Sequence, residues 1–211
     1  MTQGKRLATL DPSQLPEMES LGYAKLVTSY DYAMALRTLK EALLFLDVAQ
    51  PITCLNLCAG SGATLIAFET LLTEKSTSTA YYLVEQRHHL RKILSALVKD
   101  VKVDATCHVL DSTEALGPTQ VDLVVLSAIA NALSPKDNVC LQQVQEGWNR
   151  LKPGGIMVLA DHGSPPAYQR LMAIRDHLIS QGGLLQAPVL FLFFFWLSKY
   201  RLTYVDSVHI S

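Results

Sequence analysis

The apolar positions divide the chain into one amphipathic helix followed by a regular alternation of strands and helices. In the segment 30–48 the apolar residues recur at spacings of three and four, the period of one buried helix face. Pro51 ends the connection that follows. Beyond it, short apolar runs of strand length alternate with longer runs of helix length. This order predicts an α/β protein.

Five of the short runs are apolar on both faces, which is typical of parallel strands covered by helices on both sides. They are Ile52–Leu57, Ala80–Glu85, Val103–Leu110, Val121–Ser127 and Gly155–Asp161. The expected helices that accompany them are Thr64–Leu72, Arg87–Val98, Ser134–Leu151 and Ala167–Ser180. Two final strands, Val189–Trp196 and about Arg201–His209, are expected to pair antiparallel. We therefore predict a doubly wound, Rossmann-like α/β domain with a mostly parallel seven-stranded sheet in the order 3-2-1-4-5-7-6.

The length of 211 residues suits one compact domain with a short extension. Residues 1–28 carry two prolines and few periodic apolar positions, so we expect an irregular N-terminal arm and an α/β domain over residues 29–211. An apolar fraction of 49% against a charged fraction of 18% supplies a full core and excludes a disordered tail protein. The most apolar run, Val189–Leu197, is about half of the ~20 residues that a membrane span needs, and we interpret it as a buried strand.

Charge and cysteine spacing narrow the classes of partner. A net charge of −1 and a pI of about 6.6 argue against binding nucleic acid through bulk charge. Contacts to nucleic acid are expected only from local basic groups, and neither DNA nor a membrane is an expected partner. The four cysteines lack the paired spacing of a zinc site, so we expect no metal site and a reducing compartment. The N-terminus shows no apolar leader, so no secretory signal is expected.

The connection after the first strand is the leading candidate for a binding site. It reads Asn56-Leu57-Cys58-Ala59-Gly60-Ser61-Gly62. In a doubly wound sheet the ligand lies at the carboxyl ends of the strands, beside the first strand. Glycines there let the backbone approach a ligand closely. The candidate binding residues are Asn56, Cys58, Ala59, Gly60 and Gly62, and a tight strand-to-helix turn without a ligand is the alternative.

Three polar residues after the next strands complete the candidate site. Glu85 ends the second strand, 23 residues after Gly62, where a carboxylate can accept both hydroxyls of a ribose. Asp111, just past the third strand, is placed to accept from an adenine amino group, and Ser127 ends the fourth strand. The loop and Glu85 together favour a nucleoside site, whereas an acid at a strand end that only contacts solvent is the alternative for Glu85.

No residue qualifies as a catalytic base or nucleophile. The six histidines are scattered, and nothing resembles a hydrolytic triad. Ser127 and Asn131 are the only polar side chains after the fourth strand where a substrate is usually held. A basic run, Arg87 to Lys92, opens the helix after the second strand. It could bind phosphates or simply form a solvated helix face.

Three stretches together resemble one family. They are Tyr30–Leu44 leading into Cys58–Gly62, the segment Asp122–Leu133, and Arg150–Gly155 continuing through Asp161-His162-Gly163-Ser164-Pro165 to Tyr168 and Arg175. They resemble the methyltransferase-like proteins of the mitochondrial ribosomal small subunit, which are related to class I S-adenosylmethionine (SAM) dependent methyltransferases. The resemblance covers roughly residues 30–180. It implies the SAM-methyltransferase fold, SAM as the cofactor, a mitochondrial location, and RNA and proteins of the small subunit as partners.

The chain departs from the family pattern at several positions. The acid of the first motif is Asn56 here, the first glycine is Cys58, and the E-P pair is Asp161-His162. The cysteine cluster that family members carry after this point is absent, because no cysteine follows Cys140. We therefore expect a methyltransferase-fold component or assembly factor of the small subunit with weak or absent catalysis. The alternative is an active SAM-dependent methyltransferase acting on ribosomal RNA or protein.

Overall fold

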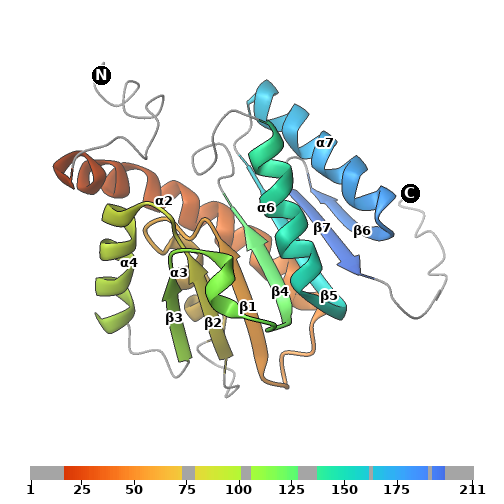
Figure 1. Ribbon diagram of the computed structural model, residues 1–211, viewed down its shortest axis with the longest axis horizontal. Coiled ribbons are helices and arrows are strands. Elements are labelled where there is room, and N and C mark those ends of the chain that lie inside the picture. The colour runs from red at the N-terminus through yellow and green to blue at the C-terminus, as the bar shows by residue number, and fades with distance from the viewer. Residues whose placement is uncertain are drawn as a thin grey trace, which may run out of the picture.

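A single sheet organises the protein (Figure 1). The computed structural model describes residues 17–72, 79–100, 106–127, 137–161, 164–189 and 192–197. Within these ranges the sheet has the order β3-β2-β1-β4-β5-β7-β6. The first five strands pair parallel, and β7 pairs antiparallel with both β5 and β6. The strands are β1 (Ile52–Leu57), β2 (Thr79–Val84), β3 (Thr106–Leu110), β4 (Val121–Leu126), β5 (Leu151–Ala160), β6 (Gly183–Val189) and β7 (Leu192–Leu197).

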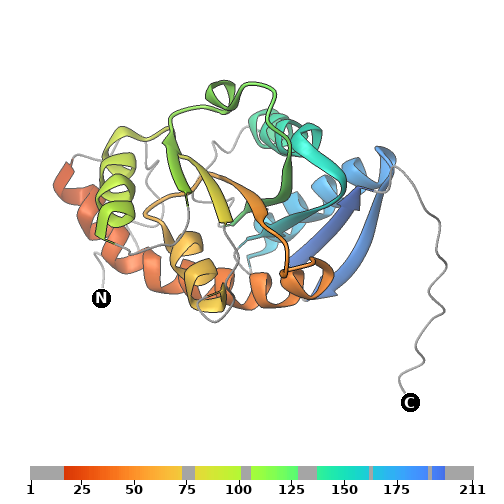
Figure 2. The same ribbon diagram turned by 90° about the horizontal axis from the view of Figure 1, so that it is seen from below.

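Helices cover both faces of the sheet, which confirms the doubly wound, Rossmann-like α/β fold (Figure 2). One face carries α2, α3 and α4, and the other carries α6 and α7. The described helices are α2 (Glu17–Ala42), α3 (Ala63–Leu72), α4 (His88–Asp100), α6 (Asp137–Arg150) and α7 (Pro165–Ser180), with short 3-10 turns η2 (Leu43–Phe45) and η3 (Thr113–Leu116). None of these helices has both the length and the apolar character needed to cross a membrane.

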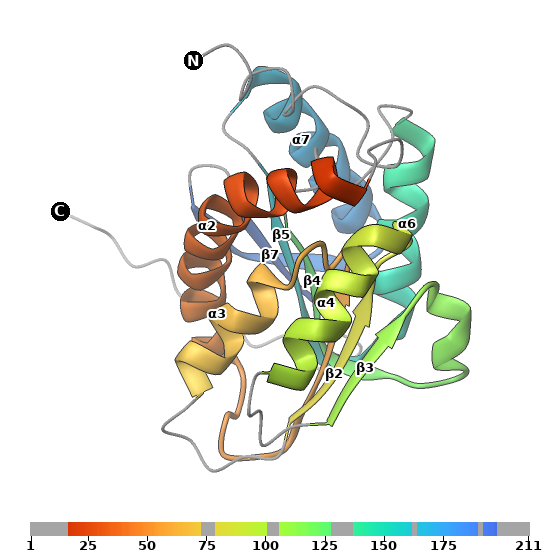
Figure 3. The ribbon, with the colours of Figure 1, turned by 90° about the vertical axis from the view of Figure 1, so that its left-hand side faces the viewer.

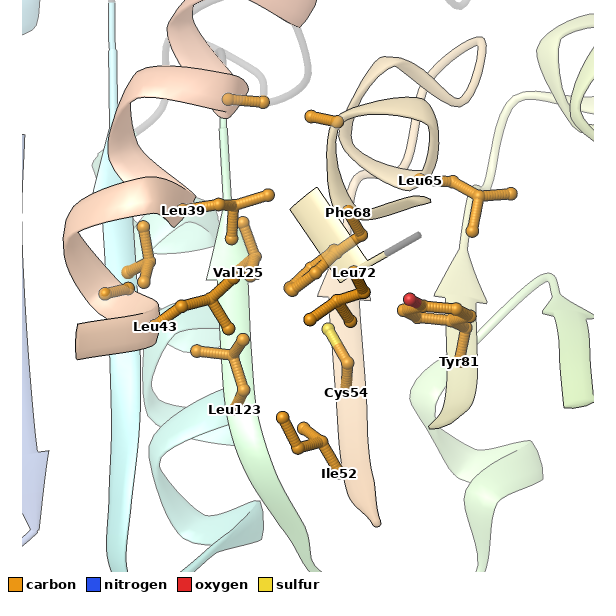
Figure 4. Close-up of a cluster of buried hydrophobic side chains, with 14 of the residues drawn as sticks. Leu39, Leu43, Ile52, Cys54, Leu65, Phe68, Leu72, Tyr81, Leu123 and Val125 are labelled. Carbon is orange, nitrogen blue, oxygen red and sulfur yellow. The ribbon is translucent and has the colours of Figure 1, made fainter. Parts of the chain in front are cut away.

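Alternation along the strands builds two hydrophobic cores, one on each face of the sheet. On β1, Ile52 and Cys54 enter the core beneath α2 and α3, while Leu55 and Leu57 enter the core beneath α6 and α7. Figure 4 shows the first core, where Phe68 lies close to Tyr81 with ring centroids 5.5 Å apart. Both cores stop at the carboxyl ends of the strands, where the polar residues begin.

The N-terminal prediction of irregular structure is wrong for residues 17–28. Helix α2 begins at Glu17, directly after Pro16, and continues unbroken to Ala42. A proline is tolerated just before the first helical residue, and the sequence that follows is rich in Glu, Met, Leu, Ala and Lys, which favour helix. Residues 1–16 lie outside the described residues, and the domain boundary at residue 28 stays a prediction.

The C-terminal strands form from residues other than those expected. The observed antiparallel pair is β6 with β7. The predicted strand Val189–Trp196 corresponds mainly to β7, and it pairs with residues 183–189 instead of the predicted partner Arg201–His209. The segment around Arg201 lies outside the described residues. Strand β6 contains Pro188, which it tolerates because β6 is the outer strand of the described sheet and its register shifts between Leu185 and Ala187. The apolar run supplies β7, which pairs on both edges inside the sheet, as a buried strand should.

Candidate functional site

The loop between β1 and α3 is a tight turn with unusual backbone angles. Cys58, Gly60 and Gly62 all have positive φ, at 60°, 58° and 97°. Glycine adopts this region without penalty, whereas Cys58 is strained there. A Cβ at Gly62 would also overlap the Leu97 side chain of α4, which would have to shift. The backbone N–H of Ala59 donates to the Val84 carbonyl (2.8 Å), so the loop is tied to the end of β2.

The carboxylate of Glu85 is bound entirely by the protein itself. The backbone N–H of Gly60 donates to Oε2 (2.7 Å). The Arg87 guanidinium donates to both oxygens, through Nε to Oε1 (2.7 Å) and through Nη2 to Oε2 (2.8 Å), and the Arg87 backbone N–H donates to Oε1 (2.9 Å). Glu85 is only 2% exposed. The position of Glu85 beside the loop agrees with the prediction from sequence, whereas its pairing with Arg87 was not predicted.

Asn56 and Ser127 are buried and fixed by neighbours in the fold. In the amide orientation that satisfies both of its polar atoms, the Asn56 nitrogen donates to the Val125 carbonyl of β4 (3.2 Å). Ser127 exchanges a hydrogen bond with Thr64 in the first turn of α3 (hydroxyl oxygens 2.9 Å apart). These contacts knit β1, β4 and α3 together at the carboxyl edge of the sheet.

The remaining predicted residues divide between the loop and solvent. Ala59 is buried in the loop, and Asp111 is exposed just after β3. The structure therefore brings the loop, Glu85 and Ser127 together at one edge, and it leaves Asp111 on the rim. The assignment of Asp111 to an adenine amino group stays a prediction.

Helix α2 lies against the loop and was missed as part of the site. The Thr28 and Ser61 hydroxyls are 2.6 Å apart. Asp31, three residues further and so on the same face of the helix, has a buried Oδ1 with no hydrogen-bond partner in the described part of the chain. Burial raises the pKa of Asp31 to about 7; the charge of Asp161 adds to this rise and the Arg87 guanidinium opposes it. Thus α2 brings a titratable carboxyl to the predicted binding site.

Two further contacts complete this edge. Asp161, at the end of β5, accepts from Nη2 of Arg170 on α7 (3.0 Å). The Cys58 thiol donates to Oε1 of Gln143 on α6 (3.1 Å). Burial, with the nearby Glu85 charge, raises the pKa of the Cys58 thiol to about 12, which makes it a poor nucleophile. Among the described residues, no group of three or more His, Cys, Asp and Glu side chains is placed to hold a metal ion.

The basic run after β2 is not a uniform phosphate-binding face. The Arg87 side chain is 12% exposed and is paired with Glu85, and Nη1 of Arg91 donates to the Glu85 carbonyl (2.8 Å) and the Gln86 carbonyl (3.1 Å). His88 and Lys92 are exposed. The spacing of four correctly predicted that Arg87 and Arg91 share one helix face. The carboxylate of Glu85, two residues before Arg87, could have indicated that this face points into the protein.

The arrangement around Glu85 does not fit a nucleoside cofactor. A carboxylate offers about four lone-pair positions, and Glu85 already receives four donors. The hydroxyls of a ribose would find no free acceptor there. SAM is therefore incompatible with this site as long as Arg87 keeps its present position.

Residues 17–190 match the family model described as mitochondrial small ribosomal subunit Rsm22. A comparison with curated proteins finds no match.

Solved structures with the same fold are methyltransferases. A protein from Methanococcus maripaludis, described as SAM-dependent, is 13% identical and covers 90% of this chain and 95% of its own (TM-score 0.60). One from Listeria monocytogenes, described as a class I SAM-dependent enzyme, is 13% identical and covers 95% and 74% (TM-score 0.61). A SAM-dependent methyltransferase from Aquifex aeolicus is 16% identical and covers 87% and 98% (TM-score 0.58). At these identities the likeness establishes the methyltransferase fold alone.

Proposed function

Because the chain belongs to the Rsm22 family of the mitochondrial small ribosomal subunit, we propose that it is a methyltransferase-fold component or assembly factor of that subunit, with weak or absent catalysis. The proposal includes a mitochondrial location and binding to RNA and proteins of the small subunit. The match spans residues 17–190, nearly all of the described chain. The match therefore supports a role carried by the α/β domain.

Two observations support weak or absent catalysis. Glu85, the acid that the fold offers to a nucleoside, is saturated by Gly60 and Arg87. Asn56, which replaces the acid of the first motif, donates to a main-chain carbonyl instead of presenting a charge. These contacts support the proposal, because a site filled by the protein's own side chains is expected to bind SAM weakly.

The charge distribution favours docking on an assembled particle. With a net charge of −1, the chain lacks the broad basic surface that binds random RNA. Of the local groups predicted for contact, Lys92 is exposed on α4, whereas Arg87 and Arg91 point to Glu85. Lys5, Arg6, Lys199 and Arg201 are further basic residues that we propose for such contacts, and they lie outside the described residues.

Sedimentation tests the ribosomal role. Tagged protein expressed in the source cells is expected to co-sediment with small-subunit particles on a gradient, and EDTA treatment that dissociates the particles should move it to lighter fractions. Lys92→Glu should weaken co-sedimentation, because it reverses an exposed charge that is proposed to contact the RNA. Lys99→Glu, an exposed lysine at the far end of α4, is the matched control. Full-length protein that stays at the top of the gradient contradicts the proposal.

The second candidate is an active SAM-dependent methyltransferase that modifies ribosomal RNA or protein. The glycine loop with Glu85 beside it, and the SAM-dependent proteins that share the fold, favour this candidate. Micromolar SAM binding by the purified wild-type chain, together with loss of one methyl mark from the small subunit when the gene is deleted, would favour the enzyme. Unchanged methylation with loss of the subunit favours the structural role.

A further inference from the structure

The Arg87 side chain and the hydroxyls of a bound ribose would compete for the same acceptors, the two carboxylate oxygens of Glu85. Both oxygens of Glu85 accept from the Arg87 guanidinium at 2.7–2.8 Å, and these oxygens are the acceptors that a nucleoside would use. The Arg87 backbone is held by α4, because its carbonyl accepts from the Arg91 N–H (2.9 Å). Its side chain can leave Glu85 by rotamer changes without moving the helix. Only the side chain separates the observed site from one with free acceptors.

A second acceptor for this guanidinium is already present on α2. Oδ1 of Asp31 is buried without a hydrogen-bond partner among the described residues, which is costly for a carboxyl group. Asp31 is within electrostatic reach of Arg87. Helix α2 packs against α3, α4 and β5, and Figure 3 shows its first half passing beside one end of α4. The Thr28–Ser61 contact fixes this helix on the same loop that Glu85 holds through Gly60.

We propose that Arg87 is a latch with two positions: it binds Glu85 in the closed site, and it moves to Asp31 when a ligand with a ribose diol binds Glu85. The ligand class is a nucleoside with free 2′- and 3′-hydroxyls. Such a ligand competes with Arg87 for one carboxylate, so its affinity is lowered by the free energy needed to open the latch. This inference goes beyond the ribosomal role, and it concerns what the methyltransferase site can still accept.

The test compares nucleoside binding to wild type and to Arg87→Met by calorimetry and by thermal shift, with S-adenosylhomocysteine and adenosine as probes. Methionine keeps much of the apolar stem and has no donors, so Glu85 becomes free for the ribose. We expect at least tenfold tighter binding than in wild type and a larger ligand-induced rise in Tm. The gain should be absent with 2′-deoxyadenosine. Equal or weaker binding of S-adenosylhomocysteine by Arg87→Met overturns the latch.

Arg91→Met is the matched control, because Arg91 contacts the carbonyls of Glu85 and Gln86 but not the carboxylate. It should bind the probes as wild type does. If Arg87→Met does not fold, Arg87→Lys replaces it, since an ammonium cannot make the two-pronged contact. The lysine variant is expected to gain affinity to a smaller extent, and no gain in it overturns the latch equally.

Asp31→Asn tests the second position. In wild type it should weaken binding of S-adenosylhomocysteine several-fold, because the displaced guanidinium loses its anionic partner. In the Arg87→Met background it should have no effect, which is the signature of coupling between the two residues. Equal effects in both backgrounds exclude Asp31 as the second position. All these measurements use the purified chain, so their failure leaves the sedimentation result, and with it the proposed function, unaffected.

Discussion

Two carboxylates at opposite edges of the sheet make the same kind of contact in different surroundings. Glu85, at the carboxyl edge, accepts from the Gly60 N–H and from Arg87. Asp122, at the amino edge in β4, accepts from the Thr53 N–H (2.8 Å) and from Nζ of Lys152 (2.9 Å). The Glu85 side chain is 2% exposed and that of Asp122 is 27% exposed. Each carboxylate therefore fixes a neighbouring backbone segment with a cation beside it, one in the interior and one near water.

Because of this difference in burial, we expect the Asp122 pair to be structural only, whereas the Glu85 pair can also take part in binding. An ion pair near water contributes little, since water replaces either partner when the other is lost. A buried pair is costly to disrupt from one side, because the remaining charge has no solvent to stabilise it. The Glu85 pair is therefore stable until another donor, such as a ribose, replaces Arg87. A ligand that replaced Lys152 at Asp122 would gain little, because water already reaches this pair.

Removing each carboxylate gives the largest expected contrast. Glu85→Ala is expected to cost about 3–5 kcal/mol of unfolding free energy, because it breaks a buried ion pair from one side and removes the acceptor of the Gly60 N–H. Asp122→Ala should cost about 1 kcal/mol, close to the value of one hydrogen bond plus a weak surface pair. Urea unfolding followed by circular dichroism measures both. Equal losses would contradict the distinction between the two edges.

The pH dependence of stability should report the unpaired carboxyl on the buried edge. The folded pKa of Asp31 is raised to about 7 from 3.8, first by burial. Between these values the folded state keeps a proton that the unfolded state has lost, so stability falls as pH rises through this window. The full cost, on the order of 4 kcal/mol, is present above about pH 7. In Asp31→Asn this part of the fall in Tm between pH 5 and 8 should disappear. Parallel profiles of wild type and variant would contradict the assignment.

The sequence predicted those parts of the fold that depend on local periodicity. The alternating apolar runs placed β1 to β5 within a few residues, because strands covered on both faces have to be continuously apolar. It failed where context overrides local preference. Pro188 is acceptable only because β6 is the outer strand, and the helix at residues 17–28 lacked a strong apolar period in its sequence.

The sequence predicted which backbone segments form the candidate site, but it did not predict that Glu85 pairs with Arg87. Glycines 60 and 62 and the acid at 85 follow from spacing, since the carboxyl ends of neighbouring parallel strands meet at one edge. Whether Glu85 faces a ligand or Arg87 depends on rotamers and on the exit angle of α4, which no spacing rule encodes. The same holds for Asp31, which reaches this edge only because α2 packs against the loop through Thr28.

The smallest expected effect concerns the backbone of the loop itself. At the amino edge, the turn into β1 is relaxed, and the Ala49 N–H donates to Oδ1 of Asp47 (3.1 Å). At the carboxyl edge, Cys58 holds a φ of 60°, which costs a residue with a Cβ about 1–2 kcal/mol. Cys58→Gly removes that strain, but it adds about 0.5–1 kcal/mol of chain entropy in the unfolded state and also loses the thiol contact to Gln143, so a stability close to that of wild type is expected. Cys58→Ala keeps the strain and loses the thiol contact to Gln143, so it should be less stable than wild type. Thermal unfolding of the two variants side by side isolates the backbone contribution, and an alanine variant as stable as the glycine variant would mean that the loop relaxes freely.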